Sequence, residues 1–174
     1  MTGLPGLSGV EHVGFTVPDM DQAVGFFTRV IGCEVAYEIG PFQAADDWMQ
    51  RQLGVHPRAV IRRLVMLRCA NGPNFELFQY ELEGAAQAPP ENSDVGGHHL
   101  AFYVTDIGAA VDHLKAHGVT VQGDVVTMTE GPSQGLAWVY FLAPWGMQLE
   151  LVSAPQGQAV TRARPAALWA PARS

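Results

Sequence analysis

Two histidines and two glutamates stand at matching points of the chain and are the residues best suited to carry chemistry. His12 and His99 lie 87 positions apart, each in a strand-like segment that is followed by a helix-start signal. Glu76 and Glu150 lie 74 positions apart, each between apolar residues of another strand-like segment. Two imidazoles and two carboxylates form a donor set suited to one divalent transition metal ion, such as Mn, Fe, Co, Ni or Zn.

The repetition of these residues favours a metal site over the more ordinary interpretations. A lone strand histidine is more often a core or edge residue than a ligand, and a lone strand glutamate usually faces solvent. An ionised glutamate among apolar residues, however, is costly to bury unless a positive group meets it. Two-fold pseudo-symmetry between the repeated segments would bring all four side chains to one ion, and it predicts His12, Glu76, His99 and Glu150 as its ligands.

The second histidine segment carries two adjacent histidines, of which the repeat selects one. Side chains alternate between the faces of a strand, so His98 and His99 point to opposite sides. His98 corresponds to Glu11 in the first segment, whereas His99 corresponds to His12. His99 is therefore the predicted ligand, and Tyr103, which shares its face, is a predicted substrate contact.

The elements that position these residues form two copies of a β-α-β-β-β module, which predicts an α+β fold. Module one spans residues 9–81 and module two spans residues 96–153, with a linker rich in Gly, Ala and Pro between them. Asp19 and Asp106 are predicted N-caps of the two helices. We expect a single domain over residues 1–153, followed by a disordered tail over residues 154–174, where Pro, Ala, Gln and Arg show little periodicity.

Module one contains an insertion over residues 40–58 that has no counterpart in module two. It includes a predicted short helix over residues 46–53, in which Trp48 is a candidate substrate contact; a solvated connector explains the segment equally well. Beyond it, Arg62 and Arg68 share one face of a strand and could meet an anionic substrate group, or could simply belong to a solvated edge strand.

Composition and charge exclude several partners. Ten basic and 17 acidic side chains give a net charge of −7, which argues against binding to nucleic acid. No apolar stretch approaches the roughly 20 residues that a membrane span needs. Residues 1–9 lack the features of a secretory signal, so a cytoplasmic location is expected. Cys33 and Cys69 have no CxxC spacing, and we expect buried reduced thiols.

With its paired modules and the positions of His12, Glu76, His99 and Glu150, the chain resembles the vicinal oxygen chelate superfamily, which includes glyoxalases, bleomycin-resistance proteins and extradiol dioxygenases. The resemblance covers residues 9–153, and residues 97–107 are similar to the corresponding part of methylmalonyl-CoA epimerases. It implies a cupped, barrel-like mixed sheet with the helices outside and the metal inside. It also implies a small-molecule substrate and is compatible with a homodimer.

The resemblance further implies proton transfer beside a carbonyl group. The ion would stabilise an enolate or enediolate of an oxygen-chelating substrate, and Glu76 or Glu150 would take or return the proton. An epimerase or isomerase is the favoured activity. The alternatives are a glyoxalase I-type lyase, an extradiol ring-cleaving dioxygenase, and a metal-free binding or resistance module.

Overall fold

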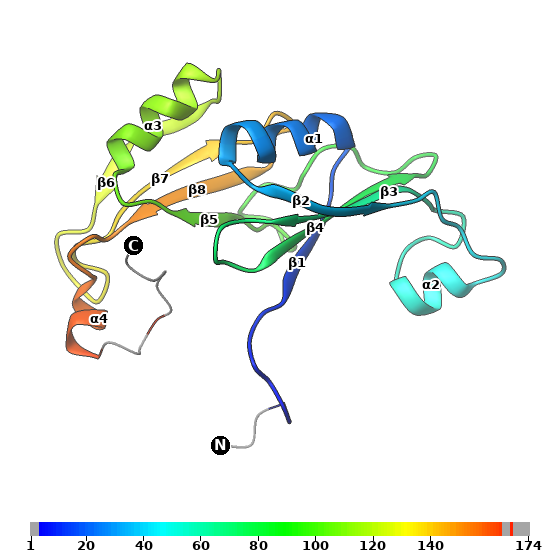
Figure 1. Ribbon diagram of the computed structural model, residues 1–174, viewed down its shortest axis with the longest axis horizontal. Helices are drawn as coiled ribbons and strands as arrows, with labels where there is room; N and C mark the ends of the chain where they lie inside the picture. Colours follow the sequence, from blue (N-terminus) through cyan, green and yellow to red (C-terminus); the bar gives the residue numbers. More distant parts are fainter. Residues whose placement is uncertain (1–3, 165–167, 169–174) are drawn as a thin grey trace. The chain divides into compact units, whose positions relative to one another are not determined.

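The computed structural model describes residues 4–164 and residue 168. The chain divides into two compact units, Met1–Ala85 and Ala86–Ser174, and each contains one β-α-β-β-β module (Figure 1). The longest helix of the described residues has 10 residues, and none of their helices is long and apolar enough to cross a membrane.

The predicted order of elements is confirmed in both units. Unit one contains β1 (His12–Thr16), α1 (Met20–Phe26), a π-helical turn η1 (Phe27–Ile31), β2 (Glu34–Ile39), α2 (Trp48–Leu53), β3 (Val60–Arg68) and β4 (Asn74–Glu81). Unit two contains β5 (Leu100–Tyr103), α3 (Ile107–Ala116), β6 (Val121–Thr127), β7 (Ala137–Leu142), β8 (Gln148–Ser153) and α4 (Ala159–Ala163).

The two sheets have the same topology. Their strand orders are β1-β4-β3-β2 and β5-β8-β7-β6, with the first pair of each sheet parallel and the other pairs antiparallel. This identity confirms the internal repeat and the α+β fold class. Each sheet is a separate hydrogen-bonded unit in the part of the chain that is described, so strand pairing does not close them into one barrel.

The main helix of each module begins at its predicted aspartate. The Asp19 carboxylate accepts a hydrogen bond from the backbone N–H of Gln22 at 2.9 Å, and Asp106 accepts one from Ala109 at 3.0 Å. Each bond satisfies an N–H group that the first turn leaves without an intrahelical partner. Both helices therefore begin where a strand of the same module has just ended.

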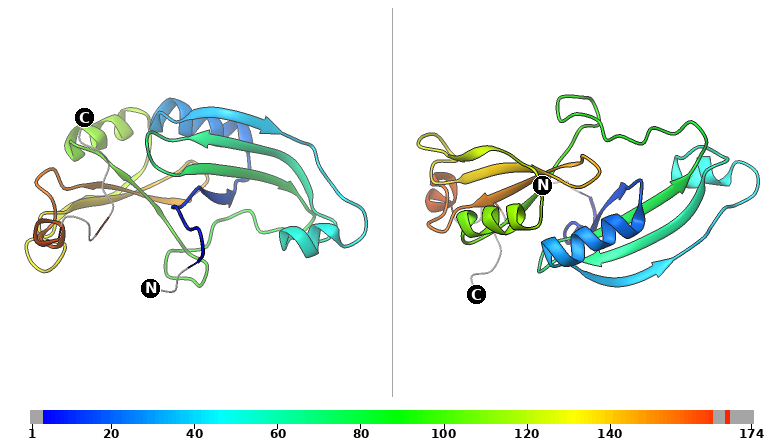
Figure 2. Two further views of the ribbon diagram at one scale, coloured as in Figure 1. Left: turned by 60° about the horizontal axis from the view of Figure 1, so that its bottom comes forward. Right: turned by 90° about the horizontal axis from the view of Figure 1, so that it is seen from above.

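Helix α1 and the π-helical turn cover one face of the first sheet (Figure 2). Phe27 is fully buried, and its ring lies 5.9 Å from that of Phe15 on β1 and 5.7 Å from that of Phe75 on β4. Because side chains alternate along β4, Phe75 and Leu77 face this core while Glu76 faces the other side of the sheet. Apolar packing on one face thus fixes the direction of the glutamate on the other.

The inserted helix α2 covers part of the face that carries Glu76. Met49 is fully buried and packs with Ile61 and Leu64 of β3. Leu64 pairs directly with Phe78, two residues beyond Glu76 on the same face of β4. The short helix predicted in the insertion is confirmed, and its packing places it on the side of the sheet where the predicted ligand lies.

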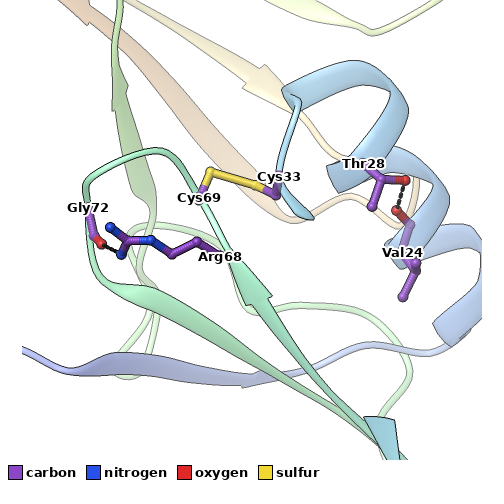
Figure 3. Close-up of a disulfide and its surroundings, with 6 residues drawn as sticks. All are labelled: Val24, Thr28, Cys33, Arg68, Cys69 and Gly72. Atoms are coloured by element: carbon purple, nitrogen blue, oxygen red, sulfur yellow. Dashed lines mark hydrogen bonds between the residues drawn. A yellow bond between two sulfur atoms is a disulfide. The ribbon is translucent and has the colours of Figure 1, made fainter. Parts of the chain in front are cut away.

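Cys33 and Cys69 form a disulfide, with their Cα atoms 4.4 Å apart (Figure 3). The expectation of two reduced thiols was wrong. The cysteines lie 36 residues apart in sequence, but antiparallel pairing of β2 with β3 places Glu34 opposite Arg68 and so brings the flanking cysteines together. Such a pairing depends on strand register, which the local sequence around each cysteine does not reveal.

Part of the segment expected to be a disordered tail is ordered. Helix α4 is attached to the loop before β7, because the backbone N–H of Ala159 donates to Gln134 O and that of Val160 donates to Pro132 O, both at 2.9 Å. The expectation of disorder therefore does not hold for residues 159–163. From residue 165 onward, apart from residue 168, the predicted tail lies outside the described residues.

Arg63 on β3 connects three elements of unit one through ion pairs with Asp21 and Glu38. Removing either ion pair should lower the free energy of unfolding by an amount that depends on pH. The Arg63 guanidinium lies 2.6 Å from Asp21 of α1 and 2.5 Å from Glu38 of β2. The hydrogen bond from Arg63 lowers the pKa of Glu38 below its ordinary value. A carboxylate whose pKa is lower in the folded than in the unfolded protein stabilises the fold at pH values above its unfolded pKa. This stabilisation is lost as the pH falls through the pKa of the folded state.

We predict that Glu38→Gln lowers the free energy of unfolding at pH 7 by about 0.5–1 kcal/mol, a small value because the ion pair is solvent-exposed. The difference from wild type should be smaller at pH 3 than at pH 7, as measured by urea unfolding at both pH values. Glu34→Gln, at an exposed position of the same strand, is the control. An equal loss at both pH values would show that the ion pair is not the cause.

Candidate metal-binding and active site

In unit one, the parallel pairing of β1 and β4 brings the first predicted histidine to the first predicted glutamate. His12 Nε2 lies 3.4 Å from Glu76 Oε2. His12 is opposite Asn74 in the register, and Gly14 is opposite Glu76, so the ligand pair is diagonal across the two strands. The imidazole is 42% exposed and the carboxylate 20% exposed, which leaves both groups open to a ligand from solvent.

Gly14 provides the space that the Glu76 side chain occupies. A Cβ atom at Gly14 would lie 3.5 Å from Glu76 Oε2 and 3.8 Å from the Phe78 ring. These are ordinary van der Waals distances, so a methyl group fits but a longer side chain would meet the carboxylate. The corresponding residue in unit two is Ala101, opposite Glu150, which is also small.

Unit two repeats the arrangement with the second pair. His99 Nε2 lies 3.1 Å from Glu150 Oε2, and the carboxylate is 13% exposed. His98 turns away, with its Nδ1 lying 3.0 Å from the backbone carbonyl of Gly96. His99, and not its neighbour, thus lies beside a carboxylate, and its role as a metal ligand stays a prediction.

Both histidines have a second polar contact on the other ring nitrogen. His12 Nδ1 contacts the carboxylate of Glu11, and His99 Nδ1 lies 3.2 Å from the side-chain amide of Asn92. The contact with Glu11, followed by the attraction of Glu76, raises the pKa of His12 against the opposing effect of burial. Neither Glu11 nor Asn92 was singled out from sequence.

The Glu150 carboxylate is largely buried and lies beside an imidazole. Burial raises the pKa of Glu150 above its ordinary value, and the neighbouring His99 opposes that shift. When ionised, a carboxylate with a raised pKa is a stronger base than an ordinary one. The surroundings of Glu150 therefore suit it to removing a proton.

An aromatic pair flanks each histidine–glutamate pair. In unit two, the Tyr140 ring lies edge-on to His99 at 5.1 Å, and Trp138 lies 5.3 Å from Tyr140. In unit one, Phe78 and Tyr80 stack at 5.5 Å with an interplanar angle of 11°. Aromatic rings beside a polar pair can hold the apolar part of a small molecule.

The two tyrosines keep their phenolic protons. Burial, with a further contribution from the nearby glutamate, raises the pKa of Tyr80 and of Tyr140. Each hydroxyl can therefore donate a hydrogen bond at neutral pH. The spacing of Tyr80 from Glu76 on one strand was a signal in the sequence, whereas the position of Tyr140 opposite Glu150 depends on the register of β7 with β8.

The residues predicted to contact substrate lie in varied places. Tyr103 is in register with Val152, two residues beyond Glu150 on β8 and on the same face. Trp48, at the start of α2, is 36% exposed and lies 5.5 Å edge-on from the ring of Phe42. These placements are compatible with the prediction for both residues, which stays a prediction.

The two predicted arginines have partners within unit one. Arg68 donates to the carbonyl of Gly72 at 2.6 Å and so closes the turn between β3 and β4 (Figure 3). Arg62 lies 3.1 Å from Glu81 and lines a hollow of about 450 Å³. Gln79, which also lines that hollow, faces the opposite side of β4 from Glu76. For both arginines, contact with substrate stays a prediction.

The donor chemistry of each pair fits a divalent ion. One imidazole nitrogen and one carboxylate oxygen face each other in each unit, and two such pairs would supply a set of two nitrogens and two oxygens. Within the described ranges, no group of three or more His, Cys, Asp or Glu side chains is arranged to hold a metal ion. The four-ligand site therefore stays a prediction.

Residues 9–151 match the profile of the Glyoxalase/Bleomycin resistance protein/Dioxygenase superfamily. The chain belongs to this superfamily. It is 52% identical over 156 residues to a protein from an Actinomyces species named 2-epi-5-epi-valiolone epimerase, which covers 89% of this chain and 84% of that protein. It is also 28% identical over 146 residues to the uncharacterized protein YaeR of Escherichia coli K12, covering 84% of this chain and 96% of YaeR.

Solved structures of the superfamily share the fold. A glyoxalase family protein from Bacillus cereus aligns with a TM-score of 0.68 at 21% identity, over 88% of this chain and 98% of that one. The resemblance predicted from the repeated histidines and glutamates is confirmed.

We predict a graded effect of side-chain size at Gly14. Gly14→Ala should leave Co²⁺ binding within about twofold of wild type, while Gly14→Leu should weaken it at least tenfold, because the longer side chain displaces the Glu76 carboxylate. The affinity is measured by competition with a chelating dye. Gly9→Leu is the control, because a Cβ atom there meets no atom within 4 Å. Equal affinities for all three variants would contradict the spatial role of Gly14.

Proposed function

We propose that the protein is a divalent-metal-dependent epimerase that inverts a carbon centre beside the ketone of a small cyclic polyol. The observation that carries this proposal is the presence of a histidine–glutamate pair at the same position of each module. The superfamily supports the metal, and the 52% identity to a protein named as an epimerase of 2-epi-5-epi-valiolone supports the reaction and the substrate class.

His12, Glu76, His99 and Glu150 would hold the ion. When bound, the ion supplies a Lewis acid that polarises a carbonyl oxygen and makes a neighbouring C–H bond easier to ionise near neutral pH. The residues must then perform the proton transfer themselves. Inversion at carbon requires that a proton leaves from one face and returns to the other.

We assign the removal of that proton to Glu150. Each glutamate would act in proton transfer only after loosening from the ion. The Glu150 carboxylate would take the proton from carbon and become a neutral acid, Glu76 would return a proton to the opposite face, and exchange of protons with water would restore both groups for the next turnover. The raised pKa of Glu150 supports its role as the base. The hydroxyls of Tyr80 and Tyr140 could donate hydrogen bonds to oxygens of the polyol, since both phenols are protonated at neutral pH.

The proposal also covers the substrate, the oligomeric state and the cellular location that the sequence led us to expect. A small-molecule substrate fits an enzyme of this superfamily. We further propose a homodimer in the cytoplasm, which light scattering after gel filtration and localisation of the tagged protein would test.

We predict that the purified protein binds about one divalent ion per chain and interconverts the epimers of 2-epi-5-epi-valiolone only when that ion is present. Removing the ion with a chelator should abolish conversion, and Mn²⁺, Co²⁺, Ni²⁺ or Zn²⁺ should restore it, as followed by proton NMR of the ketone. Full activity after removal of all metal would contradict metal dependence. Conversion of a methylglyoxal hemithioacetal in place of the ketone would favour the glyoxalase I-type activity instead.

We predict that Glu150→Gln lowers kcat for epimerisation by at least 10²-fold, because an amide cannot accept the proton from carbon. The matched control is Glu130→Gln, at an exposed position of the same unit. In D₂O, the wild-type product should carry deuterium at the inverted carbon. If Glu150 is the group that removes the proton, Glu150→Gln should show neither inversion nor deuterium exchange. Full turnover of Glu150→Gln would exclude Glu150 as the base.

A further inference from the structure

A histidine ligand must present a nitrogen lone pair to its metal, and the group that contacts its other nitrogen decides which nitrogen this is. A carboxylate has only acceptor oxygens, so it keeps the proton on the ring nitrogen that it contacts. In metal sites such a contact holds the ring in one orientation and makes the ligand more basic. The surroundings of His12 and His99 differ in this respect.

The imidazole of His12 lies between two carboxylates. Its Nδ1 contacts Glu11 Oε2, and its Nε2 lies 3.4 Å from Glu76 Oε2. The contact with Glu11 is the closer of the two, so the proton of the neutral ring stays on Nδ1 and the Nε2 lone pair faces the side on which Glu76 lies. Glu11 therefore selects the ring nitrogen that a metal at the predicted site would need.

Glu11 is itself held in place by the strand that carries Glu76. The side-chain amide of Asn74 donates to Glu11 Oε1 at 2.8 Å and to the Glu11 carbonyl at 3.2 Å, and the backbone N–H of Asn74 donates to the same carbonyl at 3.0 Å. Asn74 lies opposite His12 in the register of β1 with β4. These contacts form a chain that begins and ends on β4 and runs through Glu76, His12, Glu11 and Asn74.

We propose that Glu11, held by Asn74, is a positioning residue that fixes the tautomer and orientation of His12 for metal binding. This inference rests on the proposed metal-dependent function. It assigns a role to a residue outside the four predicted ligands, and the role belongs to unit one alone.

Unit two lacks this arrangement. The residue that corresponds to Glu11 is His98, which turns to the Gly96 carbonyl, and His99 Nδ1 instead lies 3.2 Å from the amide of Asn92. A carboxamide can either donate or accept, so it does not impose one tautomer on the ring. The two histidines should therefore depend on their neighbours to different degrees.

The test compares Glu11→Gln and Asn92→Ala with wild type. We expect Glu11→Gln to weaken Co²⁺ binding by about 10- to 100-fold, the usual cost of removing such an outer contact, and Asn92→Ala to weaken it by a smaller factor. Affinity is measured at pH 8 by competition with a chelating dye. Glu34→Gln, an exposed glutamate on β2, is the matched control and should bind as wild type does.

A metal-free measurement separates failure of this inference from failure of the proposed function. The ¹⁵N NMR signals of the His12 ring, recorded at alkaline pH, should show the proton on Nδ1 in wild type and a mixture of tautomers in Glu11→Gln. Asn74→Ala should shift the mixture in the same direction while the thermal midpoint stays close to that of wild type.

The possible outcomes are distinct. Wild-type protein that binds no metal would overturn the proposed function, and the tautomer of His12 would still decide the role of Glu11. Unchanged affinity and an unchanged tautomer in Glu11→Gln would overturn the positioning role. A lower thermal midpoint with an unchanged tautomer would also overturn it, because it would show that Glu11 and Asn74 only attach the segment before β1 to the sheet.

Discussion

Parallel pairing of the first and last strands of each module is the constraint on which the rest of the structure depends. Residues far apart in sequence meet only because β1 lies beside β4 and β5 lies beside β8. The pairing sets His12 against Glu76 and His99 against Glu150, and it requires the intervening strands to return on the other side of β4 and β8. The helix that connects each first strand to the second then covers one face of the sheet and leaves the other face for the polar pair.

The polar pairs are possible because the opposite face carries the stabilising core. Phe75 and Leu77 are buried under α1, so the glutamate between them must project to the other side. A small residue opposite the glutamate, Gly14 in one module and Ala101 in the other, leaves room for its carboxylate. The cost of holding a carboxylate at a partly covered position is offset by the imidazole beside it and, in the proposed function, by a metal ion.

The modules share a topology but not their surroundings. Helix α2 closes over the face of the first sheet through Met49, and a disulfide joins the ends of β2 and β3. Unit two has neither feature in its described part, and its histidine meets an amide where the first meets a carboxylate. A duplicated scaffold thus presents two similar histidine–glutamate pairs with different neighbouring groups and different cover.

The sequence by itself determined the repeat, the order of the elements within each module, and the helix caps at Asp19 and Asp106. These features depend on local periodicity and on spacing, which are visible in one chain. Only the tertiary structure decided the disulfide, the contacts of Glu11 and Asn92, and the place of Tyr140 opposite Glu150. Each of these depends on strand register or loop path, because a shift of one residue would send the same side chains to the other face.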